Sequence, residues 1–123
     1  MYIRSSKPEQ KPALNLHIWD NDQALKRLNQ NSDLLEKLVE IYRDSTPKLI
    51  HSIKESAADK DHIRLKDQAH ALKGISANIN AEKIASTCQQ LESMSTDIDD
   101  PKLSKLINQL QEDYDALDKK LTS

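Results

Sequence analysis

The side chain best placed for chemistry in this sequence is the imidazole of His70, within the segment Lys66 to Asn80, KDQAHALKGISANIN. On a helix that turns about 100° per residue, the apolar residues of this region fall on the side opposite His70. They are Leu65, Leu72 and Ile79. The spacing therefore predicts an outward-facing imidazole, which is a nucleophile in its neutral form.

Two residues one helical turn after His70 would shape such a site. Lys73 would place a positive charge near a phosphoryl group on the ring and would help to keep the free imidazole neutral. Gly74 is the only glycine of the chain, and in mid-helix it costs roughly 1 kcal/mol relative to Ala. Because its position faces outward, clearance for a bulky group approaching the ring would explain it. An exposed His beside a Lys is also compatible with an ordinary solvated surface.

Four further residues share the predicted exposed stripe with His70. Lys66 and Asp67 lie one turn before it, and Ile63 and Ala77 lie two turns away on either side. We expect these residues to contact a partner, although Ile63 and Ala77 could equally be incidental exposed residues.

The helix expected after this segment carries Gln89 and Glu92, either of which could orient the imidazole by a hydrogen bond to a ring nitrogen. Cys88 lies on the apolar side of the same helix with Ile84 and Leu91. This position predicts a buried, unreactive thiol. A single cysteine cannot form an internal disulfide, which favours a reducing, cytoplasmic location.

The remaining histidines, His17, His51 and His62, have no His, Cys or acid at a metal-ligand spacing, so no metal site is predicted. The net charge is −2, and no basic stripe is interleaved with aromatic residues, which argues against nucleic acid as a partner. No apolar run approaches the roughly 18 residues that a membrane span needs. Residues 1–13 lack the apolar core of a signal peptide.

The composition favours helices over strands. The chain of 123 residues has one Gly, no Phe and a single Val, whereas strands and hairpins draw on such residues. Its length suits one domain with one core. We therefore expect an all-α fold.

The N-terminal region predicts a tail followed by a short helix. Residues 1–15 are largely polar with two prolines, as in a flexible tail or an interdomain linker, so the folded module should occupy residues 16–123. Asp20, with Gln23 three residues later, matches a capping box at the start of a helix that ends near Asn29.

A long amphipathic helix should begin at Ser32-Asp33. Pro47 lies inside its pattern and lacks a backbone donor, so we expect a kink or a split near Ser45-Thr46. The residues expected on the inner side recur at spacings of three and four: Leu34, Leu35, Leu38, Ile41, Tyr42, Leu49 and Ile53.

Three more helices are predicted. The helix of His70 should begin near Asp59 to Asp61 and end at Asn78 to Asn80, where Asn80 can be left-handed or cap the next helix. The run Asp99-Asp100-Pro101 marks the start of the last helix. Four long helices joined by short connections pack best as an antiparallel bundle, with the short N-terminal helix at one end. The inner residues expected in the last helix are Leu103, Leu106, Leu110, Leu117 and Leu121.

The segment Gln68 to Ile79, QAHALKGISANI, resembles the signature of the histidine-phosphotransfer (HPt) family, in which a phosphorylatable His precedes Leu-Lys-Gly and a run of small residues. The resemblance covers about residues 17–93 and is strongest to C-terminal HPt modules of bacterial hybrid sensor histidine kinases. It implies that His70 accepts the phosphoryl group, that Lys73 lies near the phosphate and that Gly74 gives access.

The sequence departs from the family pattern at two positions. Ile75 is bulkier than the Ala or Ser often found there, but at about 140° from His70 it should point inward. Asn80 replaces a frequent Gly and tolerates a left-handed conformation. Neither change should disturb the site.

The resemblance implies a phosphorelay intermediate that takes a phosphoryl group from a receiver-domain aspartate and passes it to another receiver. The module would be a monomer that binds no cofactor, with Mg²⁺ supplied by the receiver. It would lack ATP binding and autokinase activity, even within a larger hybrid kinase. The signal, the two receivers, the phosphorylated ring nitrogen and whether the chain stands alone are not determined by the sequence.

Two other functions compete with this one. A histidine-kinase dimerisation segment usually has an acid after its His and a Pro soon after, whereas Ala71 follows here and the next proline is Pro101. One glycine also cannot form a Gly-rich ATP lid. A non-catalytic helical adaptor, a degenerate HPt module that binds a receiver or another partner, remains compatible with the sequence.

Overall fold

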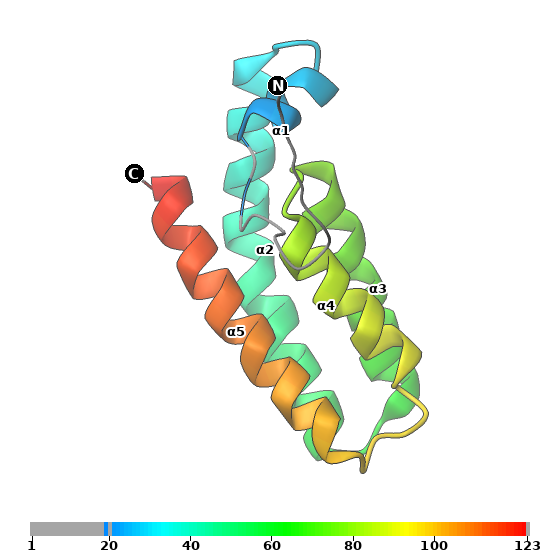
Figure 1. Cartoon of the computed structure of the whole chain (residues 1–123). Helices are drawn as coiled ribbons and strands as arrows, with labels where there is room; N and C mark the ends of the chain where they lie inside the picture. The colour runs from blue at the N-terminus through cyan, green and yellow to red at the C-terminus, as the bar shows by residue number, and fades with distance from the viewer. Residues whose placement is uncertain (1–18, 20, 123) are drawn as a thin grey trace, which may run out of the picture.

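The computed structural model describes Trp19 and residues 21–122, and within them it contains five α-helices and no strand. The helices are α1 (Asn21–Arg27), α2 (Ser32–Ala58), α3 (His62–Asn78), α4 (Glu82–Ser93) and α5 (Pro101–Thr122). The four longer helices alternate in direction along the bundle, and α1 lies at one end of it (Figure 1). The all-α bundle predicted from the sequence is confirmed. The expectations for residues 1–15, His17 and Asp20 lie outside the described residues.

Short polar side chains start the helices of the first half of the bundle. The side chain of Asn31 accepts a hydrogen bond from the amide of Leu34 at the start of α2, at 3.0 Å, and Asp61 accepts from the amide of Arg64 at the start of α3, at 3.1 Å. Between α3 and α4, Asn80 is left-handed with φ 60°. Of the two roles predicted for Asn80, the left-handed conformation is observed. The other role, the N-cap of α4, is taken by Ala81.

Helix α2 continues through Pro47, so of the two outcomes predicted near Ser45-Thr46, a kink or a split, the split does not occur. Proline has no N–H to donate to the carbonyl four residues earlier, which here belongs to Arg43. The hydroxyl of Tyr114 in α5 donates to that carbonyl at 3.3 Å. A hydrogen bond from another helix therefore replaces the one that proline removes.

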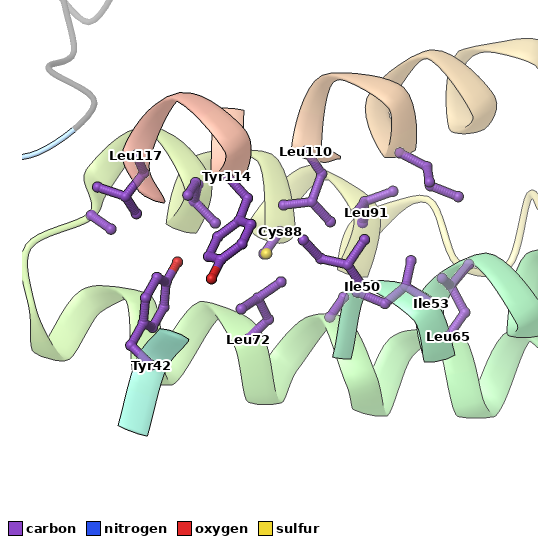
Figure 2. Close-up of a cluster of buried hydrophobic side chains, with 14 of the residues drawn as sticks. Tyr42, Ile50, Ile53, Leu65, Leu72, Cys88, Leu91, Leu110, Tyr114 and Leu117 are labelled. Atoms are coloured by element: carbon purple, nitrogen blue, oxygen red, sulfur yellow. The ribbon is translucent and has the colours of Figure 1, made fainter. Parts of the chain in front are cut away.

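The core lies between α2, α3, α4 and α5, and its side chains meet along the length of the bundle (Figure 2). Two residues expected on the inner side of α2 are instead exposed, Leu34 by 40% and Ile41 by 57%. Each precedes a buried residue, Leu35 or Tyr42, so it is turned about 100° away from the core. The largest fully buried apolar side chains are Tyr42, Ile50, Ile53, Leu65, Leu72, Ile79, Ile84, Leu91, Leu110 and Leu117.

Trp19 and, in α1, Arg27 are joined to the C-terminal end of α3. The indole nitrogen of Trp19 donates to the carbonyl of Ile79 at 2.7 Å, and Arg27 Nη1 donates to the carbonyl of Ala77 at 2.6 Å. These carbonyls lie at the end of a helix, where intrahelical donors run out. The short helix α1 thus fixes the end of the helix that carries His70.

Within Trp19 and residues 21–122, no helix combines the length and the apolar character that crossing a bilayer requires.

Candidate functional site

The imidazole of His70 lies at the surface near the middle of α3, with 69% of the side chain exposed. The buried residues of α3 occupy the opposite side of the helix: Leu65, Ala69, Leu72 and Ser76. The outward orientation predicted from the periodicity is therefore confirmed. Because the backbone of α3 is held by the core on one side, the ring is presented on a fixed support.

A carboxylate from the neighbouring helix α4 joins His70 to Lys73. Glu92 Oε2 lies 3.0 Å from His70 Nδ1, and Glu92 Oε1 lies 2.7 Å from Lys73 Nζ. Only 17% of the Glu92 side chain is exposed. One partly buried carboxylate thus holds both the ring and the ammonium group.

The charge state of Glu92 decides which ring nitrogen is available. The hydrogen bond from Lys73 lowers the pKa of Glu92, and the hydrogen bond with His70 lowers it further, whereas burial acts in the opposite direction. An ionised carboxylate only accepts hydrogen bonds, so Nδ1 must be the ring nitrogen that carries a proton. In the neutral ring, the lone pair then lies on Nε2.

Lys73 uses two of its three N–H donors within the site. Besides Glu92, it donates to Gln89 Oε1 at 3.0 Å. The sequence offered Gln89 and Glu92 as alternatives for orienting the ring, and the structure places Glu92 on the ring and Gln89 on the lysine. The direct neighbour of the ring is therefore a carboxylate, and the same carboxylate also binds Lys73. The sequence did not predict this shared contact.

Gly74 is exposed one turn after His70, and its backbone is not left-handed. Apart from its own stretch of helix, a Cβ atom added there would meet none of the described residues within 4 Å. Neither the packing of the described residues nor the backbone conformation thus requires a glycine at this position. The low steric bulk leaves room for a group that approaches from outside.

The other residues predicted to flank the site are also at the surface. Lys66, Asp67 and Ala77 are exposed, and Ile63 is 66% exposed, an unusual degree for so large an apolar side chain. Ile75 instead packs against the core, as its position on the helix predicted.

Arg27 is a residue near the site that the sequence analysis did not single out. It lines a groove with Lys73, Ala77 and residues of α4. Arg27 precedes Lys73 by 46 positions, and a basic residue at the end of a short helix is too common to indicate a site. Only the tertiary structure, in which Arg27 Nη1 donates to the carbonyl of Ala77 in α3, places it there.

The remaining candidates do not join this cluster. His51 is exposed and lies 3.4 Å from Glu55 of its own helix, and His62 is exposed at the start of α3. His17 lies outside the described residues. Burial raises the pKa of the Cys88 thiol to about 12. Among the described residues, no three His, Cys, Asp or Glu side chains come together as a metal site.

Comparison with known proteins agrees with this architecture. The model of the Hpt domain family matches residues 37–120. The histidine-containing phosphotransfer protein B (HptB) from Pseudomonas aeruginosa PAO1 superposes with a TM-score of 0.77 and 19% identity, over 85% of this chain and 91% of that one. The HPT domain of a sensor hybrid histidine kinase from Shewanella gives 0.72 and 22%, over 88% and 97%. At these identities the two structures support the fold. No curated protein matches the chain.

Proposed function

The chain belongs to the Hpt domain family and is a phosphotransfer module of two-component signalling, and from this premise we propose that His70 is the side chain that carries the phosphoryl group. The supporting observation is that Glu92 engages Nδ1 of an otherwise exposed ring, at 3.0 Å. The proposed nucleophile is therefore Nε2.

In the proposed reaction, the Nε2 lone pair of neutral His70 attacks the phosphorus of a receiver aspartyl phosphate. The N–P bond forms as the bond from phosphorus to the aspartate oxygen breaks, and the receiver carboxylate leaves with the electron pair. The proton on Nδ1 stays in its hydrogen bond with Glu92. The ring becomes positively charged when its second nitrogen is bonded, and the carboxylate at 3.0 Å stabilises that charge. Attack by a second receiver's aspartate reverses the step.

Lys73 and Gly74 have supporting roles in this proposal. The third N–H of Lys73 can donate to a phosphoryl oxygen while the other two remain with Glu92 and Gln89. The absence of a side chain at Gly74 leaves room for the phosphoryl group and for the partner that brings it. Phosphoryl transfer depends mainly on such positioning and charge stabilisation.

We propose receiver domains as the partners, docking on the exposed side of α3 that carries Ile63, Lys66, Asp67 and Ala77. Mg²⁺ bound by the receiver would neutralise charge on the phosphoryl group during transfer. As an Hpt domain the chain is a phosphotransfer carrier, and we further propose that it neither binds ATP nor phosphorylates itself. We also propose a monomer in the cytoplasm.

The test is to mix the purified chain with a Mg²⁺-loaded receiver labelled at its aspartyl phosphate, and to follow the label. Wild type should take up label that is acid-labile and base-stable, as a phosphohistidine is. The variant His70→Gln should take up none. The variant His51→Gln, which removes another exposed histidine, should behave as wild type, and ¹H–¹⁵N correlation spectra of the phosphorylated ring should place phosphorus on Nε2.

Absence of transfer from a broad panel of receivers to folded wild-type protein would contradict the proposal. The adaptor function would then explain the chain better, with receiver binding that persists in His70→Gln. Label on Nδ1 would contradict the role given to Glu92 while leaving the carrier function intact.

A further inference from the structure

A groove runs along the surface from the phosphoryl-carrying site towards α1. Its lining includes Lys73 and Gln89, which are hydrogen-bonded to each other beside the His70 site. It also includes Arg27 of α1. Between them its wall is made of small residues, including Ala77 and Ala85. Such a surface lets the side chain of a partner approach the two cationic groups closely.

The two cations of the groove differ in what they are bound to. Lys73 is paired with Glu92 at 2.7 Å. Arg27 donates to the carbonyl of Ala77, and within the described residues its guanidinium pairs with no carboxylate. A guanidinium has five N–H donors in a planar fork that fits a carboxylate. After one bond to a carbonyl, Arg27 still has donors and a full positive charge to offer.

The start of α4 brings the positive end of a helix dipole and the Glu82 carboxylate to this region. Ala81, which precedes the helix, has no side chain that could cap the first amides of α4. The first residues of α4 line the same groove, and the positive end of a helix dipole favours a negative charge nearby. Glu82 is the acidic residue among those that line the groove, and Arg27 and Lys73 are the basic ones.

Arg27 also lies within reach of a partner that is centred on His70. Ala77, which Arg27 contacts, follows His70 by seven residues, or about 10 Å along the helix at 1.5 Å per residue. A stable interface covers about 800 Å² on each partner, which extends well beyond that distance. A receiver that reaches His70 would therefore cover the end of α3.

We propose that Arg27 is a docking residue, whose guanidinium pairs with a carboxylate at the surface of the receiver domain that exchanges the phosphoryl group with His70. The inference rests on the proposed function. It adds that the docking surface of the receiver is negatively charged near Arg27 and that this surface covers the C-terminal end of α3. Arg27 takes no part in the chemical step.

The experiment compares Arg27→Gln, which removes the charge but keeps a donor for the Ala77 carbonyl, with Arg27→Lys, which keeps the charge. Lys26→Gln is the matched control, because Lys26 is an exposed cation of the same helix that does not line the groove. Each protein is phosphorylated in two ways, by phosphoramidate alone and by the phosphorylated receiver that reacts fastest with wild type. The second reaction is followed against receiver concentration and salt, and melting temperatures are compared.

Arg27→Gln should raise the half-saturating receiver concentration about three- to tenfold at low salt, as expected for a charge at an interface rim. The difference should shrink towards 1 M salt, where the Debye length is about 3 Å. The transfer rate at saturation and the reaction with phosphoramidate should not change. Arg27→Lys should retain most of the wild-type affinity, and Lys26→Gln all of it.

An unchanged half-saturating concentration in Arg27→Gln would overturn the proposal. So would equal losses in Arg27→Gln and Arg27→Lys together with lower melting temperatures, because that pattern would assign Arg27 to holding α3 alone. If phosphoramidate modifies wild type but no receiver does, the proposed function itself fails, and the docking role fails with it.

Discussion

Helix α3 takes part in two hydrogen-bonded clusters that differ in what they leave free. At the surface, His70 and Lys73 share the carboxylate of Glu92. In the interior, the hydroxyls of Tyr42 and Ser76 form a hydrogen bond of 2.8 Å between α2 and α3. The surface cluster keeps a ring nitrogen and an ammonium N–H available to a partner, whereas the buried pair faces only the rest of the chain.

This difference follows from the cost of burying polar groups. A buried hydroxyl without a partner destabilises the fold, so groups such as Tyr42 and Ser76 are bonded to each other. Burial also raises the pKa of Tyr42, so its hydroxyl stays neutral. Exposed groups can exchange a protein partner for water at little cost. Substitutions in the interior should therefore change stability, and substitutions in the surface cluster should mainly change transfer.

The largest effect on stability is expected for Leu72→Ala. Leu72 lies between His70 and Lys73 in the sequence of α3, and its side chain is fully buried. Truncation of a buried Leu costs about 2–5 kcal/mol of unfolding free energy. Urea unfolding measures this loss. Phosphorylation by phosphoramidate at low temperature should persist in the folded fraction, and its complete loss there would show that the site depends on the core more directly than we infer.

The next effect is expected for Tyr42→Phe, which leaves the Ser76 hydroxyl without its partner in the interior. The expected cost is about 1–3 kcal/mol, since a buried polar group becomes unsatisfied. The double variant Tyr42→Phe with Ser76→Ala should recover part of that cost. Equal transfer rates in all these folded variants would support the division between the two clusters.

A smaller effect of opposite sign is expected for Gly74→Ala. Outside its own stretch of helix the added Cβ meets none of the described residues within 4 Å, and Ala in mid-helix is more stable than Gly by about 0.5–1 kcal/mol. Thermal unfolding should thus show a more stable protein. Transfer from a receiver should become slower, and more so in Gly74→Leu. A variant that is both more stable and equally fast would remove steric access as the reason for this glycine.

The smallest effect on stability is expected for Glu92→Gln, and it should depend on pH. Lys73 lowers the pKa of Glu92 in the folded chain, so the carboxylate stabilises the fold above its ordinary pKa. This contribution is lost as the pH falls through the lowered pKa. Wild type should therefore be slightly more stable than Glu92→Gln at pH 7, and the difference should vanish in acid once the pH has fallen through the lowered pKa of Glu92.

The same variant should affect transfer much more than stability. An amide does not supply the negative charge that stabilises the phosphorylated, positively charged ring. Glu92→Gln should therefore shorten the lifetime of the phosphorylated protein, measured as loss of label over time. A loss of stability in Glu92→Gln as large as that in Tyr42→Phe would contradict the contrast between the two clusters.

Much of the architecture could be predicted because it depends on local patterns. The spacing of apolar residues gave the helices and turned His70 outward, and Asp61 and Asn80 marked the ends of α3 by preferences of single residues. Local patterns were not enough at Leu34 and Ile41, which are exposed, or at Pro47, where the helix does not split. At Pro47 the hydroxyl of Tyr114, which is distant in sequence, donates to the carbonyl that proline leaves without a donor.

The candidate site divides in the same way. His70, Lys73 and Gly74 lie within five positions of one another, so a helical period is enough to place them on related parts of one surface. The sequence does not distinguish Gln89 from Glu92 as the partner of the ring, because the rotation of α4 against α3 selects it. Arg27 gave no signal, since its place beside Ala77 depends on how α1 packs.

The sequence by itself determined that the protein is helical and that His70 is exposed beside a lysine and a glycine, since these properties arise from residues a few positions apart. Only the tertiary structure decided that Glu92 holds Nδ1, that Gln89 holds Lys73 and that Arg27 reaches the same groove. The physical reason is that a hydrogen bond between helices requires a particular rotation and axial shift of both, which the packing of the whole core sets.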